Sequence, residues 1–302
     1  EFITRKFEDL FTFCMGAHYL NDFSRKTQDK IISYGELLSN YIIYSYIVST
    51  NCASKPIAFV DARQIIKTNS NYTNARVDSD ITNENIKMLI DENNEKEIFI
   101  VTGFISSDLR GNTTTLGRGG GDYTAAIFGC ALDADIVEIY TDVDGIMTSD
   151  PRKVDNAFTI PRLSYNEMLE LSHYGANVIY TPTILPLYRK NIPIVVKNTN
   201  NLNSPGTYID TSMVKTDNIA TAISTIDNIG FFKIYGTYLI GKIGFSGNLF
   251  SLFSKHNINI ILISQSSCEY SIYIATYKND LDKTLDVLNS EYRDNIENGS
   301  LC

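Results

Sequence analysis

The sequence is poor in the residues that build metal sites and disulfide frameworks. Its 302 residues include three histidines, five cysteines and no tryptophan. The histidines lie far apart, and we assign none of them a catalytic role. The cysteines are odd in number and show no CxxC spacing: Cys14, Cys52, Cys130, Cys268 and Cys302. Neither a zinc site nor a disulfide framework is indicated, and we predict no metal-ligating residue.

Long apolar runs and dense basic runs are also missing. No apolar run approaches the roughly 20 residues of a membrane-spanning helix, and the N-terminus lacks the basic-then-apolar order of a signal peptide. The net charge is −9, and nucleic-acid binding requires a basic surface. We therefore expect a cytoplasmic protein with no nucleic acid and no membrane as partner, in which an anionic substrate must find local positive charge.

The length and composition predict two globular domains. Single cores usually stop growing at roughly 250–300 residues, and 43% hydrophobic with 20% charged residues is the balance of a globular protein. The stretch from Asn200 to Thr216 is polar, contains Ser204-Pro205-Gly206 and has no sustained periodicity. We place the boundary just beyond it, which gives domains at residues 1–217 and 218–302.

The first domain has the pattern of an α/β fold. Apolar residues at helical spacing predict a long helix from Lys26 to Val48, with Glu36 inside it. Strands alternating with helical stretches predict a mainly parallel sheet between helical layers. The strands are expected at four short apolar runs: Ile57–Val60, Ile98–Phe104, Ile136–Tyr140 and Ile194–Val196.

The second domain has the order βαββα of a ferredoxin-like fold. Extended segments are expected at Ala220–Ile226, Phe231–Tyr235, Ile258–Ile263 and Tyr270–Tyr277. Amphipathic helices are expected at Phe245–His256 and Asp280–Tyr292.

The richest candidate site is a glycine cluster that runs into a predicted helix, in the segment LGRGGGDYTAA from Leu116 to Ala126. Glycines let backbone N–H groups approach a phosphate, and a helix start favours the same anion. Asp122 can cap that helix and orient a cation or a substrate amine. A flexible surface turn explains the cluster about as well, since it matches neither GxxxxGK[ST] nor GxGxxG.

A second candidate segment, DIVEIYTDVDGIMTSDPR, runs from Asp135 to Arg152. It reads as a buried strand that ends in Thr141-Asp142, and ligands of open α/β sheets gather at the carboxyl ends of strands. Arg152 can donate a forked pair of hydrogen bonds to phosphate oxygens.

The order of several motifs resembles that of the aspartate kinases over about residues 28–212. These motifs are SYGELLS, VTGFIS, TTLGRGGGDYTAA, YTDVDGIMTSDPR, ELSHYGANVIYTPTILPL and IPIVVKNTNNLNSPGTYI. The sequence is most similar to the kinase half of bifunctional aspartate kinase–homoserine dehydrogenases. Beyond about residue 218 it resembles an ACT domain, the unit by which such enzymes sense amino acids.

This resemblance implies an amino-acid-kinase fold followed by a ferredoxin-like ACT regulatory domain. The implied activity is aspartate kinase: ATP-dependent phosphorylation of the L-aspartate side chain to 4-phospho-L-aspartate, with Mg²⁺, as the first step of lysine, threonine and methionine biosynthesis. ACT units usually pair, and an unpaired sheet edge gives a physical reason, so a homodimer is expected.

The resemblance also implies residue roles. Glu36 is expected to bind the aspartate ammonium group and Arg118 a substrate carboxylate, although a surface glutamate and a solvated arginine explain the residue types equally. Arg118 and Asp122 are the catalytic candidates, and Gly119 and Gly120 complete the substrate side. The expected ATP-binding residues are Thr141, Asp142, Met147, Arg152 and Asn177.

The sequence departs from the family at several positions. The family's N-terminal Lys-Phe-Gly-Gly segment, with its phosphate-facing lysine, has no counterpart, so we expect a truncated chain. Asn177 stands where a lysine is usual, Gly121 replaces a serine, and Met147 replaces an aromatic residue. A catalytically weak or dead amino-acid-binding module, or another kinase of this fold, are the alternatives.

The ACT segment contains a candidate effector site. Lys242 to Gly247 forms a strand-to-helix turn with glycines, among them Gly244, and Gln265 ends the next strand. Backbone N–H groups at a helix start suit a ligand carboxylate, and Gln265 offers both a donor and an acceptor. A tight turn with a surface glutamine is the simpler interpretation. The resemblance favours threonine as effector, otherwise lysine paired with Glu269.

Overall fold

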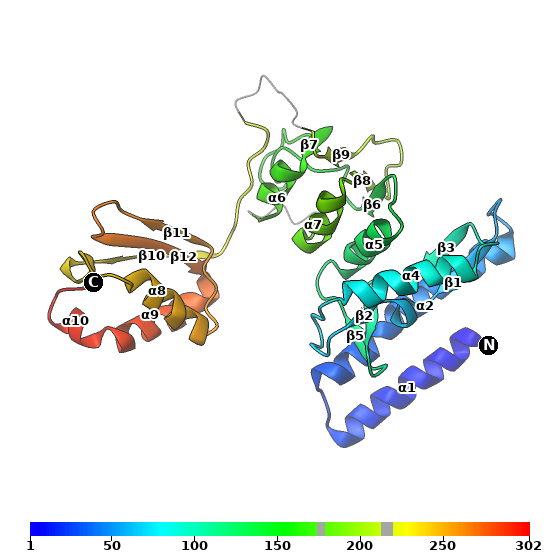
Figure 1. The fold of residues 1–302 in the computed structure, drawn as a ribbon, viewed down its shortest axis with the longest axis horizontal. Coiled ribbons are helices and arrows are strands. Elements are labelled where there is room, and N and C mark those ends of the chain that lie inside the picture. The colour runs from blue at the N-terminus through cyan, green and yellow to red at the C-terminus, as the bar shows by residue number, and fades with distance from the viewer. Residues whose placement is uncertain (174–178, 213–219) are drawn as a thin grey trace. The chain divides into compact units, whose positions relative to one another are not determined.

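A computed structural model of the protein describes residues 1–173, 179–212 and 220–302 (Figure 1). The chain forms two compact units, Glu1–Thr225 and Ile226–Cys302. The predicted boundary after residue 217 falls between the described ranges. None of the helices in these ranges has both the length and the apolar character needed to traverse a bilayer.

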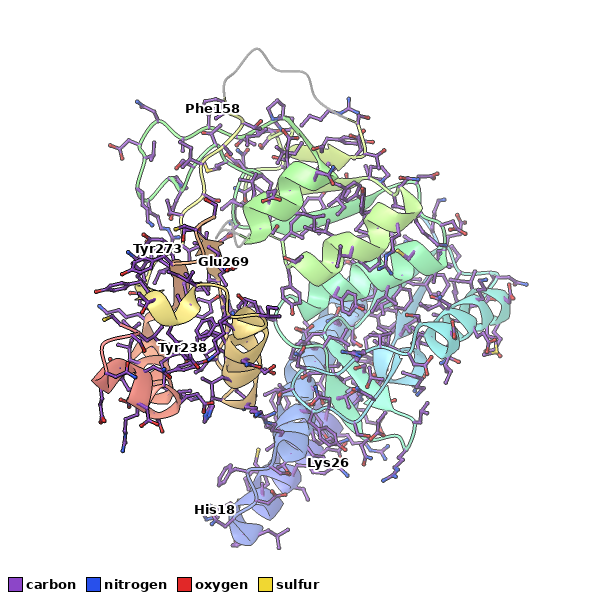
Figure 2. All side chains as sticks on the ribbon, turned by 60° about the vertical axis from the view of Figure 1, so that its left-hand side comes forward. His18, Lys26, Phe158, Tyr238, Glu269 and Tyr273 are labelled. Atoms are coloured by element: carbon purple, nitrogen blue, oxygen red, sulfur yellow. The ribbon has the colours of Figure 1, made fainter. Side chains whose placement is uncertain are left out.

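The first unit begins with two long helices that lie side by side, α1 (Phe2–Leu20) and α2 (Arg25–Thr50) (Figure 1). The Ser24 hydroxyl caps α2 by accepting from the Thr27 N–H at 3.3 Å. His18 and Lys26 lie close to the turn between the two helices (Figure 2). Helix α2 confirms the predicted helix, whereas α1 was not predicted.

Short strands and helices follow α2. Strand β1 (Ile57–Val60) pairs in parallel with β3 (Ile98–Val101), and β2 (Lys67–Thr68) with β4 (Ile105–Asp108). Strand β4 also pairs antiparallel with β5 (Thr113–Thr115). Helices α3 (Ala62–Ile65) and α4 (Ser79–Glu92) lie between these strands in the sequence. The single run predicted at Ile98–Phe104 is wrong, because β3 ends at Val101.

The rest of the first unit contains a four-stranded sheet in the order β6-β8-β9-β7. Strands β6 and β8 run parallel, as do β7 and β9, while β8 and β9 run antiparallel. The alternation of strands and helices confirms the predicted α/β class. The elements are α5 (Gly120–Ala131), β6 (Val137–Thr141), β7 (Arg162–Ser164), α6 (Tyr165–His173), α7 (Thr181–Lys190), β8 (Ile194–Asn198) and β9 (Thr207–Asp210). Leu163, Ile184 and Ile194 are fully buried in its core.

The second unit is an antiparallel sheet in the order β10-β12-β11 with helices packed on one face. Its elements are β10 (Ile229–Tyr235), a 3-10 turn η1 (Thr237–Leu239), α8 (Phe245–Lys255), β11 (Leu262–Gln265), β12 (Ser271–Tyr277), α9 (Lys278–Glu291) and α10 (Arg293–Glu297). This order confirms the ferredoxin-like prediction. On the outer edge of β10, Tyr235 and Cys302 exchange two main-chain hydrogen bonds of 2.8 and 2.9 Å.

The segment that joins the units is not the predicted strand. Residues Ala220–Ile226 form no regular strand. The Ile223 N–H donates to the Thr148 carbonyl at 2.8 Å, and the Thr221 hydroxyl donates to Glu167 at 3.0 Å. These bonds hold the segment on the first unit, which explains why the second unit begins only at Ile226.

Candidate functional site

The glycine cluster forms a tight turn, here called the glycine loop (residues 116–121), at the start of α5. Gly119 caps the helix in the left-handed region with a φ of 64°. A Cβ on Gly119 would lie 2.4 Å from the Tyr180 Cβ, and one on Gly120 would lie 2.8 Å from the Phe104 ring. Any larger residue at these two positions would therefore displace the surrounding chain.

The VTGFIS motif packs directly against the glycine loop. Phe104 holds a left-handed φ of 67°, which is strained for a residue with a side chain. Its N–H donates to the Thr124 hydroxyl at 3.0 Å, and its carbonyl accepts from the Leu116 N–H at 2.9 Å. Phe104 thus bonds both to the glycine loop, at Leu116, and to the first turns of α5, at Thr124.

The two catalytic candidates lie at this loop. Arg118 is exposed on it, and Asp122 is half-buried in the first turn of α5. Burial raises the pKa of the Asp122 carboxyl above its ordinary value. The suggested capping role of Asp122 is wrong, because α5 begins at Gly120, its N-cap residue is Gly119, and no side chain caps it. The Asp122 carboxylate thus makes no cap bond and stays available to a ligand.

Glu36 lies on a different element from Arg118. It is half-buried in α2, and burial raises the pKa of its carboxyl while a 3.2 Å hydrogen bond from the Asn40 amide acts in the opposite direction. Within the described ranges, no hydrogen bond or ion pair joins Glu36 to Arg118. The two predicted substrate groups therefore carry charges of opposite sign on different elements.

Sequence reasoning missed a residue that connects these elements. Asp29, in α2, has no exposed surface. Its carboxylate accepts hydrogen bonds from the Thr73 N–H at 2.9 Å, the Thr115 N–H at 3.1 Å and the Thr115 hydroxyl at 2.8 Å. The sequence feature that could have pointed to Asp29 is its position seven residues before Glu36, on the same face of the helix.

A cavity of about 480 Å³ lies beside the glycine loop. Leu116, Tyr123 and Tyr180 line one part of it, and the segment 69–76 supplies three asparagines, Ala75 and Arg76. Arg76 is exposed and adds a cation that the sequence did not single out. Amide, hydroxyl and guanidinium groups therefore surround a space next to Leu116 of the glycine loop.

Two of the residues predicted to bind ATP, Thr141 and Asp142, lie at the carboxyl end of β6. Thr141 is the last residue of β6, pairs with Asn198 of β8, and donates from its hydroxyl to Asp142 at 3.2 Å. Met147 forms an antiparallel bridge with Thr159.

Arg152 and Asn177 complete the predicted nucleotide side. Arg152 is exposed and forms an ion pair with Asp150 at 2.9 Å. Its guanidinium is therefore oriented by a carboxylate, with most of its surface still open to solvent. Asn177 lies outside the described residues.

A second cavity, of about 280 Å³, lies in the ACT segment and is here called the ACT cavity. Gly244 and Gln265 both line it, so the structure brings together the two predicted effector residues. Gly244 caps α8 with a φ of 84°, and a Cβ there would meet no atom within 4 Å. The first N–H groups of α8 have no acceptor within the helix, which is the property that lets a helix start bind an anion.

Charges of both signs lie around the ACT cavity. Glu269, in the turn between β11 and β12 (Figure 2), accepts from the Gly241 N–H at 3.1 Å. The Lys242 ammonium lies 3.4 Å from the centre of the Tyr238 ring and bonds to its hydroxyl. A carboxylate and an ammonium at one cavity suit a free amino acid.

Comparison with known families agrees with these two units. The amino acid kinase family matches residues 7–198, and an ACT domain matches residues 232–292. This chain belongs to the amino acid kinase family. The expected amino-acid-kinase fold with an ACT domain is confirmed, and the family match begins well before residue 28, where the motifs alone placed it.

Similar proteins are aspartokinases. The bifunctional aspartokinase/homoserine dehydrogenase of Buchnera aphidicola is 35% identical over 99% of this chain and 36% of its own length, and chloroplastic enzyme 2 of Arabidopsis thaliana is 35% identical over 92% and 31%. E. coli aspartokinase III in complex with aspartate and ADP superposes with a TM-score of 0.77 and 31% identity, covering 91% of this chain and 60% of that one. The chain spans about a third of the length of these curated relatives.

Proposed function

We propose that this chain is the kinase and ACT portion of an aspartate kinase, which phosphorylates the side-chain carboxylate of L-aspartate with ATP. The observation that carries the proposal is the glycine loop at the start of α5, closed by Tyr180 and Phe104 and carrying exposed Arg118. The similarity to E. coli aspartokinase III, solved with aspartate and ADP, supports the same assignment.

The substrate groups follow from charge. Arg118 binds a carboxylate of aspartate through a charge-assisted pair of hydrogen bonds, and Glu36 binds its ammonium group. Gly119 and Gly120 bind the substrate through the loop backbone in this proposal, and the absence of side chains on them lets Tyr180 and Phe104 pack against that loop. Asp122 lies in the first turn of α5, and burial raises the pKa of its carboxyl. In this proposal the transferred phosphoryl group passes beside it.

The nucleotide lies at the carboxyl end of β6 in this proposal. Thr141, Asp142 and Met147 contact ATP, and Arg152 neutralises phosphate charge after release from Asp150. Asn177 is proposed to donate a hydrogen bond to the nucleotide, because an amide can donate but carries no charge.

We propose that Mg²⁺ enters this site bound to the nucleotide. Among the described residues, no three His, Cys, Asp or Glu side chains gather around one point. Mg²⁺ is usually held by substrate phosphates with one or two carboxylates, and Asp122 and Asp142 are carboxylates of that kind. When bound, the ion neutralises charge on the phosphates.

The proposed reaction is one in-line displacement. An oxygen of the aspartate β-carboxylate forms a bond to the γ-phosphorus, the bond to the β,γ-bridging oxygen breaks, and ADP leaves with that electron pair. A carboxylate is already a nucleophile at neutral pH, so no general base is needed. Positioning by Glu36 and Arg118 and charge neutralisation then supply most of the catalysis.

The proposed effector of the ACT cavity is threonine. The N–H groups at the start of α8 bind its carboxylate, Glu269 its ammonium group, and Gln265 its hydroxyl. Lysine is the alternative, with Glu269 on the side-chain ammonium, and E. coli aspartokinase III has been solved with lysine. A homodimer and a cytoplasmic location stay predictions.

A coupled assay for ADP release tests the proposal in the full-length protein. We expect turnover with L-aspartate and little with L-glutamate or N-acetyl-L-glutamate. Preference for either of the other acids would identify another kinase of this fold. Aspartate or threonine binding without ADP release would instead favour the weak or inactive regulatory module, for which Asn177 is one argument.

A further inference from the structure

A buried carboxylate outside the predicted site joins three segments of the first unit. Asp29 has no exposed surface, and its two oxygens accept three hydrogen bonds from Thr73 and Thr115. A buried charge is costly unless it is hydrogen-bonded, and hydrogen bonds to a charged acceptor are among the strong ones. Such a cluster holds its donors firmly in place.

The first segment leads into the glycine loop. Thr115 ends β5 and lies three residues before Arg118. Asp29 accepts from both donors of Thr115, while the Thr115 carbonyl accepts from the Ala75 N–H at 2.9 Å. The direction in which the chain enters the loop is therefore set at Thr115.

The second segment lies beneath the loop. Thr73 holds a left-handed φ of 70°, which is uncommon for a β-branched residue, and Asp29 accepts from its N–H. A Cβ on Gly117 would lie 3.2 Å from the Thr73 carbonyl oxygen and 2.9 Å from the Asn74 amide oxygen. The bond to Asp29 thus stabilises the strained turn that supports Gly117.

The third segment is α2 itself. Asp29 and Glu36 are seven residues apart, which is two helical turns on one face and about 10 Å along the axis. Moving Asp29 relative to Thr115 would therefore move Glu36 relative to the glycine loop.

We propose that Asp29 is a positioning residue for the amino-acid substrate. It fixes the distance between the ammonium-binding group, Glu36, and the carboxylate-binding group, Arg118, although it touches neither. This inference rests on the proposed aspartate kinase function. A residue that sets this spacing controls the KM for aspartate and has little effect on the KM for ATP.

The test is Asp29→Asn in the full-length protein. Asparagine keeps the shape but removes the negative charge. Its NH2 group can be accommodated only beside the Thr115 hydroxyl, which can also accept, and the two backbone N–H donors are left with a neutral acceptor. We expect the KM and the calorimetric Kd for L-aspartate to rise about tenfold or more, the factor expected from losing a hydrogen bond to a charged group. The KM for ATP should change less than about twofold, because a substitution away from a binding site usually has only a small effect on it.

A second variant covers the case in which Asp29→Asn does not fold. Thr115→Val removes only the hydroxyl donor, and we expect a smaller rise in the KM for aspartate. Thr115→Ser keeps both donors and should match the wild type. Tyr165→Phe is the control for general destabilisation, because it removes a buried hydroxyl that donates to the Ile192 carbonyl in the core, outside the site.

The outcomes separate this inference from the proposed function. A wild type that neither binds nor phosphorylates aspartate would refute the proposed function. With an active wild type, an unchanged KM for aspartate in Asp29→Asn and Thr115→Val would overturn the positioning role. An equal rise in both KM values, also seen with Tyr165→Phe, would overturn it in the same way.

Discussion

The two glycine turns of the molecule have the same local form and opposite surroundings. Gly119 caps α5 and Gly244 caps α8, each in the left-handed region and without a side-chain cap. A Cβ on Gly119 would collide with Tyr180, whereas one on Gly244 would meet nothing within 4 Å. The first turn is enclosed by packed chain, and the second is open to a cavity.

The difference fits the function that we propose for each turn. The glycine loop is supported by the buried Asp29 cluster and by Phe104, so its backbone is pre-organised, as positioning for phosphoryl transfer requires. The turn at α8 has fewer neighbours and can adjust around a ligand, which suits reversible sensing. We therefore expect the glycine loop to be more rigid than the turn at α8, although both are rich in glycine.

The largest predicted effect comes from adding one methyl group to the enclosed turn. Gly119→Ala places a Cβ 2.4 Å from the Tyr180 Cβ in a backbone conformation that disfavours side chains. We expect a loss of about 2 kcal/mol or more in stability, with aspartate-dependent activity lost. Thermal denaturation and ADP release measure both.

Two matched variants sharpen this comparison. Gly121→Ala meets no atom within 4 Å and lies inside α5, so it should be neutral or stabilising by up to about 1 kcal/mol. Gly244→Ala should lower the stability by only about 1–2 kcal/mol, which is the cost of placing a side chain in the left-handed conformation. If all three variants lost similar stability, packing would not distinguish the two turns.

The next effect concerns charge at the enclosed turn. Arg118→Ala should raise the KM for aspartate by roughly ten- to a hundredfold, because a charge-assisted contact contributes about 1.5–3 kcal/mol. Arg118→Lys should recover only part of this, since lysine lacks the planar fork. Steady-state kinetics measure this effect. An unchanged KM for aspartate in Arg118→Ala would show that Arg118 does not bind the substrate.

A smaller effect is expected from pH. Glu36 must be ionised to bind an ammonium group, and burial raises its pKa. As pH falls through that raised pKa the carboxyl takes up a proton, so aspartate affinity should weaken at a higher pH than it would for an ordinary exposed glutamate. Calorimetry on Glu36→Gln should give weak binding with a flatter profile.

The exposed Glu97 provides the control for pH. Glu97→Gln, in a surface pair with Lys55, should keep the wild-type pH profile. The same flattening in both variants would assign the pH dependence to the protein as a whole and not to Glu36.

The smallest effect lies at the open turn. Gly247 lines the ACT cavity, and a Cβ there meets no atom within 4 Å. Gly247→Ala should leave stability within about 0.5 kcal/mol or raise it slightly, as for a helix glycine. It should also reduce the thermal shift produced by threonine. A full shift would place the ligand away from α8.

The pattern of apolar residues and glycines in the sequence predicted several elements correctly. Strand β1 has the predicted bounds, α2 differs from the prediction by one or two residues at each end, and Gly244 and Gln265 meet at one cavity. These features depend on local periodicity and on glycine at helix starts, which a sequence displays directly.

Buried polar structure could not be predicted in the same way. Strand β5 (Thr113–Thr115) was not predicted from the sequence. It is buried, and its hydroxyls bond to other segments: that of Thr115 to Asp29, and that of Thr114 to Ser106 and Thr68. The Ala220–Ile226 segment looks extended, but tertiary hydrogen bonds hold it on the first unit. The Asp29 cluster joins residues 86 positions apart, beyond any local signal.

The most direct test is a pair of titrations that separates the two turns. L-aspartate and L-threonine are titrated calorimetrically into the wild type, Arg118→Ala and Glu269→Gln. We expect Arg118→Ala to weaken aspartate binding about tenfold or more and leave threonine unchanged, and Glu269→Gln to do the reverse. If either variant weakened both ligands equally, or if aspartate bound as tightly to Arg118→Ala as to the wild type, the assignment of substrate and effector to separate turns would be wrong.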